Sequence, residues 1–188
     1  MFAKNVEKQI DITEAVRRFG DIAERYCAVV EQAATLSRNE FLLKVYSMLP
    51  ELIDKAIHLP LVTCDDNEEV NLEEETRARA LEEQARMSHE NWWQLLSMLK
   101  VKFADWDTYW MVFDPTKESE AIHGSLANDI ADIYRDLKEG VFLAALNEYP
   151  KRNVIFEWRV GFDTHWGRHA VDALGVFHAR SAEIQEEV

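Results

Sequence analysis

An apolar stripe with helical spacing is the feature that most limits what this chain can fold into. Between residues 12 and 33 the apolar side chains step by three and four positions: Ile12, Val16, Phe19, Ala23, Tyr26, Val30 and Ala33. That spacing places them on one face of an α-helix, about 100° apart per residue. The stripe predicts a long amphipathic first helix that packs its apolar face against other elements.

Similar stripes predict further helices along most of the chain. A capping box at Ser37 and Glu40 opens a second helix, and Pro50 predicts a kink or break in it near Leu49. The third is expected from a cap at Asn71 through Leu99, with Ser88 in its stripe. The fourth is expected from Gly124–Ser125 to Tyr149–Pro150, and the fifth from a cap at Asn153 to about Glu183.

Sustained period-two alternation, the signature of a half-buried strand, is absent from the sequence. The aromatic segment FADWDTYWMVFDP, residues 103–115, is interpreted as a short helix or compact loop that packs an end of the bundle or floors a ligand pocket. The prediction is an all-α, single-domain bundle of about five main helices with no sheet, spanning residues 1–188. An acidic connection is expected at about 64–75 and a frayed tail at about 184–188.

The net charge limits the kinds of molecule that the protein is expected to bind. The net charge is −14, which argues against nucleic-acid phosphates and anionic membrane surfaces, since both select clustered Lys and Arg. A basic protein partner or self-association remains compatible with it. The N-terminus lacks the apolar core of a signal peptide, and no apolar run is long enough to span a bilayer. We therefore expect a cytoplasmic protein.

The common catalytic signatures are missing. The chain has no dinucleotide or phosphate-binding glycine loop, no GxSxG elbow and no HExxH motif. One Glu-x-x-His pair, Glu120 and His123, falls in a predicted loop, whereas a di-iron bundle needs two such pairs on helices. Whether the protein is an enzyme is left open by the sequence.

Two polar stripes offer a candidate site. In EWRVGFDTHWGRHAVDAL, residues 157–174, a continuous helix would place His169 about 40° and Asp172 about 20° from His165, on the apolar face. The fourth predicted helix carries a strip of three aspartates at spacings of three and four, and two arginines of the fifth are expected to face it. These residues are Asp129, Asp132 and Asp136, with Arg159 and Arg168.

Three interpretations of this cluster remain open. In the first, His165 and His169 each hydrogen-bond an aspartate or a carbonyl and lock two helices in register. In the second, His165, His169 and Asp172 bind a divalent metal, with Asp129 or Asp132 completing the shell. In the third, a His–Asp pair acts as a general base. All three require that buried polar groups find partners, because an unpaired one costs several kcal/mol.

The segments SLANDIADIYRDLKEG and EWRVGFDTHWGRHAVDAL also resemble a bacterial family of small all-α proteins catalogued only as a domain of unknown function. The resemblance covers nearly the whole chain and is strongest from Tyr109 to Leu174. It implies a helical cytoplasmic protein with no assigned activity. Its motif residues here are Asp129, Asp132, Tyr134, Arg135, Asp136, Trp158, His165, Trp166, Gly167, Arg168 and His169.

Two functions from different classes follow. The acidic surface and the missing catalytic motifs favour a non-enzymatic protein-interaction or regulatory module, which binds another protein or itself. The alternative is a metal-binding protein or metal-dependent enzyme, with its site between the fourth and fifth predicted helices.

Overall fold

A computed structural model of the protein describes residues 11–62, 72–112, 114, 116–118 and 120–186. In chain order its elements are α1 (Ile12–Glu31), α2 (Arg38–Ile57), α3 (Leu72–Ala85), α4 (His89–Phe103), η1 (Ala104–Trp106), β1 (Thr108–Val112), β2 (Ala121–Ser125), α5 (Leu126–Ala145), α6 (Lys151–Thr164), α7 (Trp166–Ala179) and α8 (Ser181–Glu186).

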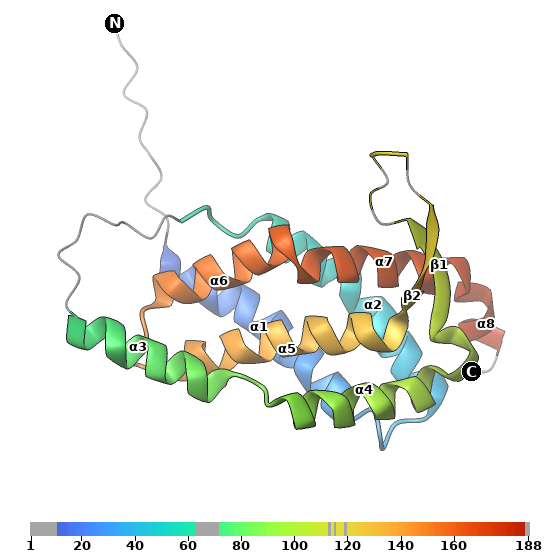
Figure 1. The fold of residues 1–188 in the computed structure, drawn as a ribbon, viewed down its shortest axis with the longest axis horizontal. Helices are drawn as coiled ribbons and strands as arrows, with labels where there is room; N and C mark the ends of the chain where they lie inside the picture. Colours follow the sequence, from blue (N-terminus) through green and yellow to red (C-terminus); the bar gives the residue numbers. More distant parts are fainter. Residues whose placement is uncertain (1–10, 63–71, 113, 115, 119, 187–188) are drawn as a thin grey trace, which may run out of the picture.

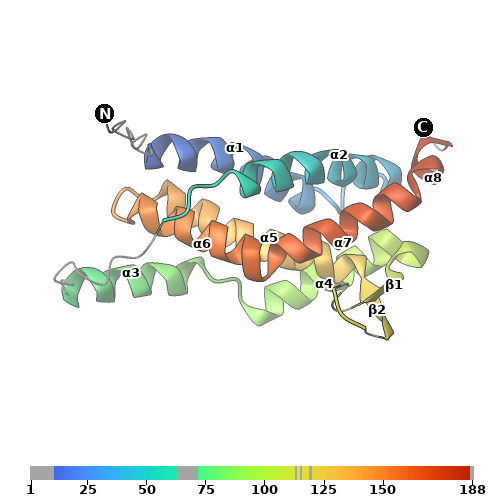
Figure 2. The ribbon, with the colours of Figure 1, turned by 90° about the horizontal axis from the view of Figure 1, so that it is seen from above.

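The helices form three layers, and α5 lies in the middle one (Figures 1 and 2). Helices α1 and α2 lie on one side, α5, α6 and α7 form the middle layer, and α3 and α4 lie on the other side (Figures 1 and 2). Helix α5 contacts α1, α3, α4, α6 and α7. It is therefore enclosed on several sides, so polar residues on it can be buried. None of the described helices is long and apolar enough to cross a membrane.

The structure is mostly helical, as the sequence predicts, and several helix starts are confirmed. Ser37 and Glu40 form the capping box of α2, and Ser125 caps α5 by accepting a hydrogen bond from the Asn128 amide. Of the kink or break expected near Leu49, the break is wrong, because α2 continues through Pro50. Buried side chains on both sides of the proline, Leu49 and Leu52, pack this helix against the core.

The single third helix predicted up to Leu99 is wrong, since two helices occupy this region. Ser88, assigned to its apolar stripe, instead ends the linker between α3 and α4 and accepts a hydrogen bond from the Asn91 amide as the N-cap of α4. A serine side chain can accept a hydrogen bond from a nearby backbone amide, which favours serine at the start of a helix over its interior. The predicted cap at Asn71 lies outside the described residues. The acidic connection expected at about 64–75 is too long, because α3 already begins at Leu72.

The prediction of no sheet is also wrong. Strands β1 and β2 pair antiparallel, with Trp110 opposite His123 and Tyr109 opposite Gly124. His123 of the Glu-x-x-His pair therefore lies in a strand. Exposure alternates along β1, but both of its faces carry apolar or aromatic residues. Its five residues consequently show no period-two pattern in the sequence.

The long fifth helix is divided into α6, α7 and α8, which corrects the prediction of one helix from Asn153 to Glu183. Asn153 lies inside α6, whose N-cap is Pro150. His165 separates α6 from α7 with φ −141° and ψ −87°, outside the helical region. The tail expected to fray at about 184 still belongs to α8, which ends at Glu186; residues 187–188 are outside the described part.

A half-buried glutamate ties the α3–α4 linker to α5. The Met87 amide donates a hydrogen bond to Glu139 Oε1 at 3.3 Å. Burial raises the pKa of Glu139, against the smaller opposing effect of this hydrogen bond. An acid with a raised pKa stabilises the fold below its unfolded-state pKa, and this contribution is lost as pH rises through the folded-state pKa.

Glu139→Gln is therefore expected to raise the urea midpoint slightly at pH 7 and to leave it unchanged at pH 4. Glutamine keeps an acceptor for the Met87 amide and removes the charge that burial disfavours. Glu139→Ala serves as the control, since it removes the acceptor and should destabilise the protein at both pH values. An equal effect of Glu139→Gln at pH 4 and pH 7 would contradict the assigned direction of the pKa.

Candidate functional site

Helix α5 carries two buried carboxylates near its N-terminal end. Asp129 is 4% exposed and Asp132 is 7% exposed, although both are ionisable. Asp129 is the most buried of the three aspartates on α5, and Asp136 is half-buried. Buried charges need partners, so the surroundings of these side chains define the candidate site.

Two Asp–His pairs join α5 to the α6–α7 junction. His169 Nδ1 lies 2.8 Å from Asp129 Oδ1, and His165 Nδ1 lies 2.6 Å from Asp136 Oδ2. The two imidazole rings meet edge to face, with centroids 5.1 Å apart. An Nδ1–H donated to a carboxylate leaves the lone pair on Nε2, the tautomer that binds metals or accepts protons.

The hairpin contributes a tyrosine to the deeper pair. Tyr109 Oη donates a hydrogen bond of 2.7 Å to Asp129 Oδ2. Its ring crosses the partner strand at Gly124, where a Cβ would lie 2.4 Å from the ring. Glycine at position 124 therefore allows Tyr109 to reach α5, and both oxygens of Asp129 are occupied.

Asp132 faces His169 from the other side of the imidazole. His169 Nε2 lies 3.7 Å from Asp132 Oδ2, so both ring nitrogens of this histidine have a carboxylate nearby. Asp132 is held by Asn128 Nδ2, which donates to Oδ2 at 2.8 Å, and by Arg135, at 3.1 Å from Oδ1. A neutral His169 with its proton on Nδ1 would turn a lone pair toward this carboxylate. Either a second proton or a cation is needed between them.

Burial and hydrogen bonding act in opposite directions on the Asp129–His169 pair. Burial raises the pKa of Asp129, and the hydrogen bonds from His169 and Tyr109 offset this only in part. Burial alone would lower the pKa of His169, but the hydrogen bond and charge of Asp129, with Asp132 and Asp172, raise it overall. The site thus favours positive charge at His169.

A three-residue group converges in the described part of the chain. One ring nitrogen each of His165 and His169 and one carboxylate oxygen of Asp132 lie within 4.8 Å of one another. The two histidines line a cavity of about 530 Å³ between α4, the hairpin, α5 and α7, whereas Asp132 is not part of its lining. Two imidazoles and one carboxylate are a donor set typical of zinc and of non-haem iron.

The structure changes the membership of the predicted cluster. Asp172 lies on the cavity wall, but it pairs with Arg168 (Nε–Oδ2 3.3 Å) and is outside the converging group. Asp129 also lies outside it and instead orients His169. The interruption at His165 starts a new helix, so angles counted from that residue do not carry into α7.

The described contacts of the two arginines predicted to face the aspartate strip lie elsewhere. Arg159 turns away from the aspartate strip to the C-terminal end of α2, where its Nη1 donates to the Ile57 carbonyl at 2.7 Å. Arg168 bonds Asp172 and the carbonyl of Val112 on β1. Arg135, on α5 itself, neutralises Asp132 and Asp136 (N–O 3.1 and 3.3 Å). Its spacing of three from Asp132 was the available signal.

The comparisons with known proteins agree with this fold. A family model described as a domain of unknown function (DUF5063) matches residues 10–183. The chain belongs to this DUF5063 family. Membership confirms the resemblance seen in the sequence, and the family's description assigns it no activity.

A solved structure shares the architecture. The crystal structure of protein BF1032 from Bacteroides fragilis matches with a TM-score of 0.66 and 24% sequence identity, over 88% of this chain and 90% of that chain. At 24% identity, the similarity between BF1032 and this DUF5063 protein shows a shared fold and nothing more. None of the curated proteins compared with the chain matches it.

Proposed function

We propose that the protein binds a divalent transition-metal ion, most simply Zn²⁺, through Asp132, His165 and His169. The proposal rests on one observation: each histidine is paired with an aspartate through Nδ1, and the two histidines converge with Asp132. Asp129 and Asp136 occupy the two Nδ1 atoms, and the ligand atoms of both rings converge with an oxygen of Asp132 within 4.8 Å. A carboxylate behind each metal-binding histidine fixes its tautomer and increases its basicity.

The donor set favours a reactive or exchangeable site over a purely structural one. Structural zinc sites usually have four protein ligands, whereas three ligands leave a position for water or another molecule. Here that position would open toward the cavity lined by His165 and His169. Asp132 Oδ2 can ligate while it accepts from Asn128, because a carboxylate oxygen has two lone pairs.

Metal content is the direct test. Untagged protein purified without chelator is expected to hold about one equivalent of metal by mass spectrometry, and the His165→Ala, His169→Ala double variant should hold none. His123→Ala is the matched control, since His123 lines the same cavity but lies outside the group of three. The variant should keep its metal.

The opposite result would favour the structural interpretation. Absence of metal in the wild type, even after incubation with Zn²⁺, together with a large loss of thermal stability in the double variant, would overturn the proposal. His169 would then be an imidazolium between Asp129 and Asp132, and the histidines would serve to hold α5 and α7 in register.

The protein-interaction module predicted from the acidic surface stays a prediction, and so does the cytoplasmic location. Light scattering and a pull-down from a bacterial lysate test the first. A strict monomer that enriches no partner would count against it.

A further inference from the structure

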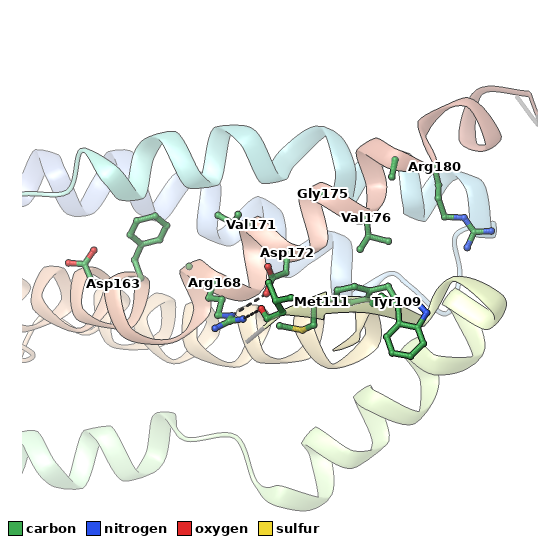
Figure 3. Close-up of a pocket in the computed structure, with 14 residues that line it drawn as sticks. Tyr109, Met111, Asp163, Arg168, Val171, Asp172, Gly175, Val176 and Arg180 are labelled. Carbon is green, nitrogen blue, oxygen red and sulfur yellow. Dashed lines mark hydrogen bonds and ion pairs between the residues drawn. The ribbon is translucent and has the colours of Figure 1, made fainter. Parts of the chain in front are cut away.

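A second hollow lies directly beside the proposed metal site. It runs between β1 and α7 and has a volume of about 840 Å³, within the range of small-molecule sites. Figure 3 shows Tyr109 and Met111 of β1 along one side and residues of α7, including Val171 and Val176, along the other. We call this hollow the β1–α7 groove.

The β1–α7 groove adjoins the histidine cavity. Met111, Arg168 and Asp172 line both of them. The Arg168–Asp172 ion pair at the junction is visible in Figure 3. A molecule bound at the metal ligands that extends past these three side chains would enter the groove.

The two ends differ in chemistry. The groove is lined mainly by apolar and aromatic side chains, and two of them are unusually exposed: Trp110 at 72% and Val171 at 54%. At the other end Lys100 of α4 lines the cavity, and its ammonium group has no hydrogen bond or ion pair with any described residue. A cation beside a metal position attracts an anionic group, while the groove offers area for apolar burial.

Gly175 leaves space free on the α7 side of the groove. It lies in α7 and lines the groove, and a Cβ placed there would meet no atom within 4 Å. Glycine inside a helix costs about 1 kcal/mol relative to alanine, so helix stability does not account for it. A side chain at position 175 would enter the space that a ligand would use.

From these observations we propose that the joined hollow binds a small amphipathic carboxylate. Its carboxylate group lies at the metal beside Lys100, and its apolar tail lies along the β1–α7 groove. This assignment rests on the proposed metal site, whose ion supplies the open coordination position for the carboxylate. The groove supplies selectivity for the tail.

Cobalt-loaded protein tests the assignment, with octanoate and acetate as probes. Binding is measured by calorimetry, and the visible absorption of Co²⁺ reports ligation at the metal. Octanoate is expected to bind at least about tenfold more tightly than acetate, since burial of two methylene groups already has this effect.

Variants of the groove and of the cavity test the two ends separately. Gly175→Leu should reduce octanoate affinity to that of acetate without changing cobalt content, and Gly175→Ala is the control for helix propensity. Lys100→Met should weaken both probes by the same factor.

Each contrary outcome has a separate meaning. Equal affinities for octanoate and acetate, or full octanoate binding by Gly175→Leu, would overturn the groove assignment. If the protein still bound cobalt normally in that case, the proposed metal site would stand. Failure to bind cobalt would overturn both proposals. A dimer that dissociates in Gly175→Leu would show that a second copy of the chain covers the groove, and would also overturn the assignment.

Discussion

Gly140→Ala is expected to lower the free energy of unfolding by about 2 kcal/mol. Gly140 lies on the buried side of α5, and an alanine Cβ there would lie 2.0 Å from Trp158 Nε1. Overpacking of this kind costs about 3 kcal/mol, and the better helix propensity of alanine offsets about 1 kcal/mol of it. Urea denaturation followed by tryptophan fluorescence measures the difference.

The indole cannot move aside easily. Trp158 is 1% exposed, and its ring packs against Phe19 of α1 with centroids 4.8 Å apart. Gly175→Ala is the matched control, because it makes the same change in a helix where the new methyl group meets open space. That variant should be more stable than the wild type by up to about 1 kcal/mol. Equal stability of the two alanine variants would mean that Trp158 is not seated against α5.

The close contact at Gly140 also shows what the sequence reveals and what it hides. The apolar stripes predicted most helices, because burial of one face is a local, periodic property. The partner of Gly140 depends instead on how α6 crosses α5. Nothing in the spacing of Trp158 identifies the glycine that its ring requires.

The interruption of the helix at His165 also depends on close contacts that the spacing of residues does not reveal. Gly167 lies so close to the preceding helix that a Cβ would come within 2.2 Å of the Phe162 carbonyl oxygen. The sequence shows two glycines in this segment, at positions 161 and 167, but a helix can tolerate each of them. The apolar spacing continues through the break, so periodicity alone predicted a single helix.

The site was predicted in part for comparable reasons. The spacing of Asp129, Asp132 and Asp136 predicted one strip of aspartates on a helix, and all three lie on the continuous helix α5. Tyr109 was not predicted as a partner of Asp129, because that contact depends on the hairpin. Helical phase can identify the residues that share a face, but tertiary packing decides which of them meet.

The strongest prediction for the site concerns Asp129, which we expect to orient His169 without touching the metal. Asp129→Ala leaves Tyr109 Oη and His169 Nδ1 without their buried acceptor, and it should cost about 3 kcal/mol of stability. Asp129→Asn should cost much less, because the amide oxygen still accepts from Tyr109 and the amide NH₂ can donate to Nδ1.

Asp129→Asn is the more informative variant, because its donated hydrogen bond moves the imidazole proton to Nε2, the atom that faces Asp132. The lone pair needed for a metal is then lost, and affinity for Zn²⁺ should fall by about 10- to 100-fold in a folded protein. Asp172→Asn is the control, because Asp172 lies on the cavity wall outside the converging group, and it should leave the affinity unchanged. If Asp129→Asn binds Zn²⁺ as tightly as the wild type, His169 does not use Nε2. If only Asp172→Asn loses the metal, the ligand set first predicted from the sequence would replace the one assigned from the structure.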